Sequence, residues 1–297
     1  MNYLKIRFKH VFKWILKFIK FPNQFIKLFF QDLKIDYINQ IKFKHNFIFV
    51  VGLPKSGSTL IENILKTIGY VDMTSSPLRY FFIDKSKNPH DISEELFQLI
   101  PKNKPTFLKL HTHYNEHNMG LLNKYNPKII FSFRNLHDVL ISRYNHILSD
   151  KKHRHHNLVN GLDLVEGFKK SLTVKNTYDT PDRPIDYFSD WIDNWKKEIS
   201  SKKLNVLILN YEDYENDKIK YISEILNYLE IRNFKANDII RDLEMKFDTF
   251  NKNNLEKNLT AFIKPQTMNI NSREIKKKLR TPEIKRFIEN QIKNKSS

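Results

Sequence analysis

The chain has 297 residues, 40% of them hydrophobic, which is enough for a large domain with a buried core and too apolar for a disordered polymer. It contains no cysteine, which excludes disulfides and thiolate metal sites and is compatible with a reducing compartment. Its 51 Lys and Arg against 33 Asp and Glu give a net charge of +18, which indicates polyanionic partners such as nucleotide phosphates, acidic lipid, acidic glycan or nucleic acid. Solvation of surplus surface lysines accounts for part of this excess.

Residues 1–45 form a basic segment ahead of the main domain. Ten Lys or Arg and two Asp alternate there with aromatic and aliphatic residues, and lysines recur at helical spacing at Lys9, Lys13, Lys17 and Lys20. These lysines interrupt the apolar stretch that a signal peptide needs, and no segment reaches the 18 apolar residues of a membrane span. The pattern predicts a basic amphipathic helix. Binding to an anionic membrane surface and packing on the body of the chain itself remain two open interpretations.

Short apolar runs alternate with segments of helical periodicity from residue 46 onward. Strands are predicted at residues 46–51, 106–110, 128–133 and 204–209, and helices at 58–68, 136–148 and 218–229. Strands separated by helices predict an α/β fold, in which a central parallel sheet is covered on both faces. The polar stretch 150–185 is expected to form a flexible insertion beside the functional site.

A glycine-bounded loop follows the first predicted strand. Gly52 and Gly57 enclose four residues before a helix, and the backbone N–H groups of such a loop form an anion cradle together with the helix N-terminus. This is the spacing of a nucleotide phosphate loop. A kinase or NTPase would place lysine after the second glycine, whereas Ser58 stands there, Lys55 lies inside the loop and Thr59 keeps the final hydroxyl. The pattern argues against an ATP–magnesium site and leaves a kinase or NTPase as the alternative.

The segment 54–59, Pro-Lys-Ser-Gly-Ser-Thr, resembles the sulfotransferase signature that binds 3′-phosphoadenosine 5′-phosphosulfate (PAPS). The resemblance implies a three-layer, P-loop sulfotransferase-like fold and sulfuryl transfer from PAPS to a hydroxyl or amine, with PAP as product. It implies that Lys55 contacts the oxygen between phosphate and sulfate, and that the 5′-phosphate is held by Ser56, Gly57, Ser58 and Thr59. Leu60 stands where cytosolic members have a tryptophan that stacks on adenine.

A catalytic pair is predicted at the end of strand 106–110. Lys109 and His111 are two residues apart and face the same side, and ligands bind at the carboxyl edge of a parallel sheet. The segment resembles the Lys-x-His element of the family. That resemblance implies that His111 is the general base and that Lys109, with Lys55, stabilises the transition state; a histidine pKa near neutrality suits a base. Glu62 is a rival base, although we interpret it as an exposed helix residue.

Other histidines cluster in the sequence without an evident metal site. His111 and His113 have the spacing of two ligands, but no third ligand matches them, so no metal is predicted. We interpret His153, His155 and His156 as part of a solvated loop.

The second predicted anion site follows strand 128–133. Arg134 ends this strand and Ser142 lies about two turns into the next helix, and a guanidinium beside a hydroxyl can bind phosphate by charge-assisted hydrogen bonds. The string Arg-Asn-x-x-Asp-Val-x-x-Ser-x-Tyr resembles the sulfotransferase segment that binds the 3′-phosphate of the donor, which implies Arg134 and Ser142 as ligands. A structural ion pair of Arg134 is the alternative. We interpret Asp138 as an early-helix carboxylate favoured by the helix dipole.

Two C-terminal segments resemble the family more loosely. Tyr211 and the two acidic residues after it resemble a segment in which the tyrosine reaches adenine; half-buried packing of Tyr211 is the alternative. Segment 269–278 contains Arg273 but no glycine, whereas cytosolic members close over the donor there with a glycine-containing loop. Segment 279–283 resembles the start of the final helix of the family, with Pro282 in the first turn.

These patterns favour a PAPS-dependent sulfotransferase without a catalytic metal, cytoplasmic or associated with a membrane. Residues 1–45 would be its basic extension and residues 46–297 its sulfotransferase domain. A third hypothesis is a basic membrane- or nucleic-acid-binding protein with a vestigial nucleotide site, although nucleic acid is disfavoured as a partner. The sequence does not identify the hydroxylated acceptor: sugars, lipids and small alcohols remain open, and the basic surface favours an acidic glycan or a lipid-borne substrate.

Overall fold

The computed structural model describes residues 45–73, 91–94, 96–97, 100, 105–175, 183–201, 203–245 and 270–295. The predicted amphipathic helix near the N-terminus lies outside these residues. Within them, no helix has the length and apolar character needed to cross a bilayer.

Five parallel strands form the central sheet, in the order β2-β3-β1-β4-β5. Their bounds are β1 Phe47–Gly52, β2 Val71–Asp72, β3 Thr106–Leu110, β4 Lys128–Phe133 and β5 Val206–Asn210. Four of these confirm the strands predicted from apolar runs. The sequence missed β2 because two residues are too few to show a pattern. Since all pairings are parallel, the carboxyl ends of β1, β3 and β4 meet at one edge, where the predicted site residues follow them.

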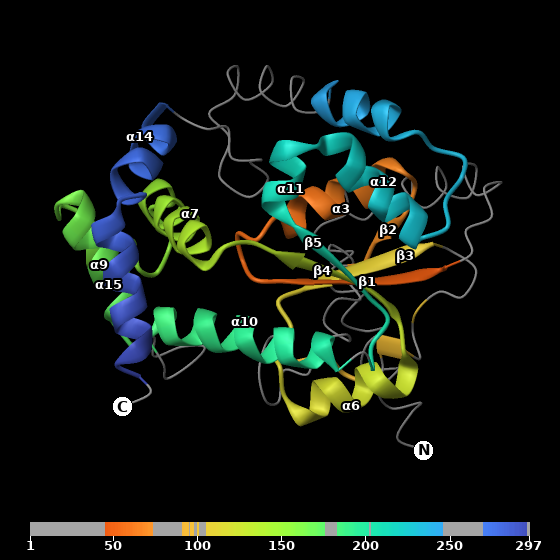
Figure 1. The fold of residues 1–297 in the computed structure, drawn as a ribbon, viewed down its shortest axis with the longest axis horizontal. Helices are drawn as coiled ribbons and strands as arrows, with labels where there is room; N and C mark the ends of the chain where they lie inside the picture. The colour runs from red at the N-terminus through yellow and green to blue at the C-terminus, as the bar shows by residue number, and fades with distance from the viewer. Residues whose placement is uncertain are drawn as a thin grey trace, which may run out of the picture.

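Helices cover both faces of the sheet, which confirms the α/β prediction (Figure 1). Alternate residues of β1 point to opposite faces: Ile48 and Val50 belong to one apolar core, whereas Phe49 and Val51 belong to the other. The first core is closed by α3 (Ser58–Thr67) and α12 (Lys218–Tyr228), beside α11 (Tyr211–Asn216). The second is closed mainly by α6 (Glu116–Tyr125), α7 (Leu136–Ser149) and α10 (Pro184–Ser200).

The expectation of a flexible insertion over residues 150–185 is wrong for its described part. Two helices lie there, α8 (His156–Val159) and α9 (Leu164–Thr173). Phe168 and Leu172 are four residues apart on α9 and are fully buried in the core, which fixes this segment despite its polar composition.

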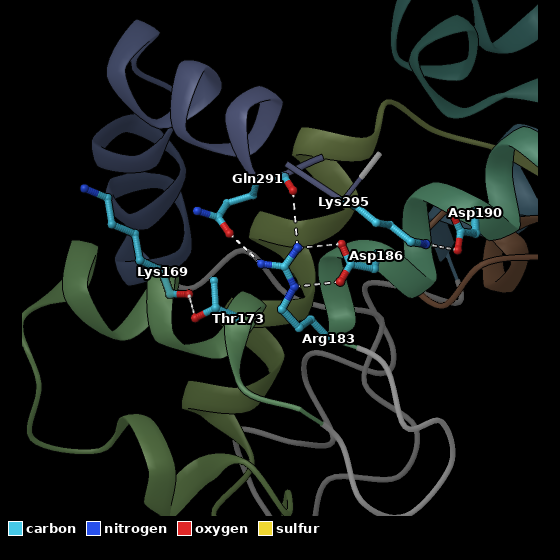
Figure 2. Close-up of polar contacts among 7 residues, drawn as sticks. All are labelled: Lys169, Thr173, Arg183, Asp186, Asp190, Gln291 and Lys295. Carbon is cyan, nitrogen blue, oxygen red and sulfur yellow. Dashed lines mark hydrogen bonds and ion pairs between the residues drawn. The ribbon is translucent and has the colours of Figure 1, made fainter. Parts of the chain in front are cut away.

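The C-terminal part consists of α14 (Ile270–Leu279) and α15 (Pro282–Lys293), which confirms the predicted start of the final helix. Figure 2 shows how α15 is attached to α10. The guanidinium of Arg183 donates two hydrogen bonds to Asp186, at 2.6 and 2.9 Å, and one of 2.7 Å to Gln291 Oε1 on α15. Lys295 forms an ion pair with Asp190. The glycine-free segment before α15 is thus helical, and the side chain of Arg273 lies outside the described part.

Candidate donor site and active site

The loop between β1 and α3 turns on two residues with left-handed backbone conformations. Lys55 has φ +73° and Gly57 has φ +101°, and Gly57 caps α3. Among the described residues no side chain caps this helix, so the N–H groups of its first turn are not satisfied by a side chain. Ser58 is buried in this turn and Thr59 is exposed. Such a helix N-terminus can bind an anion, as the spacing predicted.

Ser56 holds the loop against the sheet. Its hydroxyl is buried and donates to the carbonyl of Leu53 at 2.8 Å, and the hydroxyl of Ser132 on β4 donates to the Ser56 carbonyl at 2.7 Å. A Cβ on Gly52 would lie 2.8 Å from both Ser132 Cβ and Ser56 Oγ, so only glycine fits there. The Ser56 hydroxyl therefore points into the protein, where it fixes the loop on β4.

Lys55 brings a cation into this loop. Burial lowers its pKa to about 8, because desolvation disfavours the charged form. In the part of the chain that the structure describes, no carboxylate restores the ordinary pKa of this ammonium group. An anionic ligand would supply that compensation.

Arg134 leaves the end of β4 and joins this loop to α11. It is 6% exposed, and its Nη1 donates to the Lys55 carbonyl at 3.3 Å. Its guanidinium lies 4.4 Å from the ring centroid of Tyr211, a distance at which the cation and the aromatic face attract each other. A Cβ on Gly57 would lie 2.6 Å from Cδ2 of Tyr211. Lys55, Gly57, Arg134 and Tyr211 are thus neighbours, as two adjoining anion sites require.

Glu212 is a member of this site that the sequence did not single out. Its Oε1 lies 3.9 Å from Nε of Arg134. Within the described part of the chain, both of its carboxylate oxygens are buried without a hydrogen-bond partner, as are Arg134 Nε and Asn210 Oδ1. The only sequence signal was its position after Tyr211. Since buried polar groups are normally hydrogen-bonded, these atoms mark a place where a polar ligand fits.

His111 lies on the other side of the loop, just beyond β3. Its Nδ1 is 2.5 Å from the carbonyl oxygen of Gly52. Because a carbonyl only accepts, Nδ1 carries the proton, and the neutral ring then has its basic lone pair on Nε2. This hydrogen bond fixes the tautomer that a general base needs and ties His111 to the first residue of the loop.

A model of the sulfotransferase domain family matches residues 45–295, which include both candidate anion sites and His111. The chain belongs to the sulfotransferase family. It is therefore a sulfotransferase, of an enzyme family that uses PAPS as the sulfuryl donor. A comparison with curated protein sequences finds no match.

Solved structures that resemble the sulfotransferase share little sequence with it. Mouse sulfotransferase SULT7A1 complexed with PAP is 17% identical, with 86% of this chain and 92% of that chain covered and a TM-score of 0.48. Retinol dehydratase in a complex with retinol and PAP is 16% identical, with 86% and 83% covered and a TM-score of 0.48. Retinol dehydratase with androsterone and inactive cofactor PAP is also 16% identical, with 84% and 80% covered and a TM-score of 0.50. This last likeness supports the fold alone.

Glu62 is not the exposed helix residue that we expected. Its side chain is 14% exposed. Its carboxylate forms one ion pair with Lys109 on β3 and another, of 2.5 Å, with Lys66. Lys66 also pairs with Asp72 on β2, at 2.9 Å. The expectation fails because β3 places Lys109 against α3, a tertiary contact that the helical pattern of the sequence cannot show, whereas Lys66 lies on α3 itself, four residues after Glu62. Since both its oxygens bind ammonium groups, Glu62 holds Lys109 in place, which disfavours it as a base.

Ser142 and Asp138 share α7 beyond Arg134. Ser142 is buried, whereas Asp138 forms an ion pair of 2.8 Å with Arg280, at the end of α14. The sequence indicated only the helix dipole as a stabilising influence on Asp138, and the structure adds this ion pair with Arg280. Burial, followed by the charges of Arg134 and Arg280, lowers the pKa of Lys276 on α14. Helix α14 thus brings a further cation towards Arg134, and the sequence, which offered Arg273, did not identify Lys276.

The remaining histidines have structural partners. His113 Nε2 lies 2.8 Å from the hydroxyl of Tyr187, and His117 donates to the Ile92 carbonyl at 2.9 Å. In the described ranges, no three His, Asp or Glu side chains are grouped as metal ligands would be. The interpretation of His155 as part of a solvated loop is wrong, because it is buried against Arg143.

Proposed function

We propose that this sulfotransferase transfers the sulfuryl group of PAPS to a hydroxyl of its acceptor, through the residues that the sequence singled out. The α3 N-terminus and Lys55 bind the 5′-phosphosulfate, with Gly57, Ser58 and Thr59 in the first turn. Arg134 and Ser142 bind the 3′-phosphate, and Tyr211 lies against the adenosine. Ser56 contributes by holding the loop.

The observation that carries this proposal is the contact between the two anion sites. The Arg134 guanidinium donates to the Lys55 carbonyl at 3.3 Å, so two cationic groups from separate strands converge on one loop. A structural arginine can pair with a carboxylate at bonding distance, as Arg183 does with Asp186 at 2.6 Å. Among the described residues, the nearest acid paired with Arg134 is 3.9 Å away, and its Nε has no hydrogen-bond partner there. A ligand with a phosphate at each end of its ribose satisfies both cations.

The chemistry requires a base for the acceptor and positive charge on the leaving phosphate. The acceptor oxygen forms a bond to sulfur as the bond between sulfur and the 5′-phosphate oxygen breaks. PAP leaves with that electron pair, and Nε2 of His111 takes the acceptor proton. Lys55 and Lys109 stabilise the negative charge that develops, and Glu62 keeps Lys109 in position.

Calorimetry with PAP, AMP and ATP with magnesium tests this proposal. PAP should bind at least about tenfold more tightly than AMP, because only PAP has the 3′-phosphate that Arg134 would bind. Radiolabelled PAPS should then give labelled product with a mixed pool of hydroxyl acceptors. Tighter binding of ATP than of PAP, or magnesium-dependent ATP hydrolysis, would reject the proposal in favour of an NTPase.

A further inference from the structure

The turn between α7 and α8 is a dense cluster of basic residues, which we call the basic turn (residues 150–156). Six consecutive residues after Asp150 are Lys, Arg or His. The cationic side chains of Lys151, Lys152 and Arg154 are exposed. Asp150 is the one acid of the turn, and its Oδ1 accepts a hydrogen bond of 3.0 Å from the backbone of Lys152. Three cations are therefore presented to solvent by a short, ordered segment.

Buried hydrogen bonds hold the basic turn in one conformation. Arg143 on α7 donates to His155 Nδ1 at 2.8 Å and to the Ser171 carbonyl at 3.1 Å. His156 Nδ1 donates to the carbonyl of Ile147 at 2.9 Å. Because Arg143 can only donate, Nδ1 of His155 accepts, so His155 is neutral. The fold thus fixes the cations of this turn, whereas a merely solvated run of lysines would need no such support.

A row of imidazole rings leads from this turn to the last turn of α7. The ring centroids of His146 and His153 are 5.5 Å apart, and those of His153 and His155 are 5.6 Å apart. Burial, followed by the charge of Lys55, lowers the pKa of His146, so this end of the row lies within range of the charge of Lys55. Burial, followed by the charge of Arg143, lowers the pKa of His153 to about 4. Burial is thus the main reason that the pKa values of His146 and His153 lie below the ordinary value, and nearby cations lower them further.

An anion bound at the basic turn would reduce the mutual repulsion among Lys151, Lys152 and Arg154. The same groups would repel a cationic acceptor and would gain little from a neutral one. The position also matters, because the row of rings leads from the basic turn to His146, which is within range of the charge of Lys55. An acceptor whose hydroxyl reaches the phosphosulfate end of PAPS at Lys55 could therefore extend along this row to the basic turn.

We propose that the acceptor carries, besides the hydroxyl that is sulfated, an anionic group such as a carboxylate, phosphate or sulfate, which binds to the basic turn. This inference rests on the proposed function and adds the chemical class of the acceptor. Lys151, Lys152 and Arg154 bind the anionic group, and the imidazole row separates it from Lys55. The enzyme then selects its acceptor by charge, and this charge does not affect PAPS binding at the donor site.

A library of matched acceptors tests this inference. Each hydroxyl compound is supplied in an anionic and a neutral form: uronic-acid oligosaccharides with their carboxyl-reduced counterparts, and hydroxy acids with their amides. Glycerol 3-phosphate and vesicles of phosphatidylglycerol are added, since they distinguish a free phosphate from a lipid headgroup. With labelled PAPS, the anionic member of a pair should be sulfated at least about tenfold faster at low acceptor concentration.

Substitution of the three cations provides the second arm. The triple variant Lys151→Ala, Lys152→Ala and Arg154→Ala should lose most of this preference through a rise in KM for anionic acceptors. Its affinity for PAP should stay unchanged. The matched control is the double variant Lys197→Ala and Lys203→Ala, which removes two exposed lysines near the end of α10 and should keep the preference.

The outcomes separate this inference from the proposed function. If PAP binds but neutral members are sulfated as fast as anionic ones, the inference is wrong and the proposed function stands. Transfer to no anionic member, or an unchanged preference in the triple variant, also overturns it. If PAP itself fails to bind, the proposed function fails first.

Discussion

The phosphate loop and the Arg134 site lie side by side but are built in different ways. The loop is one continuous segment, residues 52–59, and offers backbone N–H groups of a helix N-terminus. The Arg134 site is assembled from side chains of separate elements, with Arg134 after β4 and Tyr211 and Glu212 on α11. The loop should therefore depend on backbone conformation, whereas the Arg134 site should depend on individual side chains.

The two sites nevertheless share contacts. Tyr211 lies against Gly57 of the loop, and Arg134 donates to the Lys55 carbonyl. This contact means that a change in the loop can reach the second site. Substitutions can therefore distinguish the contribution of each site to ligand binding and turnover from the contribution of the contact between the two sites.

The largest effect is expected from His111→Ala, which tests whether the general base lies beside the phosphate loop, where His111 contacts Gly52. Loss of a general base should reduce kcat by about 100-fold to 10,000-fold, and PAP affinity should change little. The matched control is His117→Ala, which removes a partly buried histidine that also hydrogen-bonds a backbone carbonyl. Equal losses of kcat in both variants would show that His111 acts through stability alone.

The next largest effect is expected from Gly57→Ala, which disturbs the contact between the sites. The new Cβ would lie 2.6 Å from Tyr211 at a φ of +101°, so both the loop and the ring must shift. PAP and AMP should both bind about 100-fold more weakly, since the loop serves both. Gly120→Ala on α6 is the control, because among the described residues nothing outside the adjoining backbone of α6 lies within 4 Å of the new Cβ. Normal AMP binding by Gly57→Ala would contradict the shared contact.

The same contrast explains what the sequence could predict. Strands 106–110 and 128–133 and the loop glycines were identified correctly, because their signals lie within a few neighbouring residues. Glu62 and His155 were placed wrongly, since their partners Lys109 and Arg143 are brought to them by tertiary packing. Lys276 and Glu212 were missed for the same reason. Local motifs therefore predict the phosphate loop, whereas the Arg134 site is assembled from separate segments that only the folded chain brings together.

Arg134→Gln tests the side-chain site alone. Losing a charged hydrogen-bonding group should weaken PAP binding about 30-fold, and AMP binding should change less than about threefold. Calorimetry of the two ligands gives the ratio. Arg241→Gln, which removes an exposed arginine paired with Asp238, should leave both affinities unchanged. A parallel loss of PAP and AMP binding would mean that Arg134 supports the loop and does not recognise the 3′-phosphate.

The pH dependence of PAP binding tests the loop through Lys55. With a pKa of about 8, the protonated fraction in the free enzyme falls from about one half at pH 8 to about one tenth at pH 9. If the ammonium form binds the phosphate, Kd for PAP should rise about fivefold over this interval. The variant Lys55→Met should bind weakly and without this step. An unchanged Kd in the wild type would show that the Lys55 charge is not used.

The smallest effect is expected from Glu212→Gln, and its sign distinguishes two roles of this residue. The carboxylate stabilises Arg134 in the free protein, but it also lowers the positive charge that a phosphate meets. If this second effect dominates, PAP should bind about threefold more tightly, while AMP is unaffected and Tm falls by about 4 °C because Arg134 loses its acid. Asp213→Asn, an exposed neighbour on α11, should change neither. Weaker PAP binding would instead mean that Glu212 orients the guanidinium, so that the second site depends on position more than on charge.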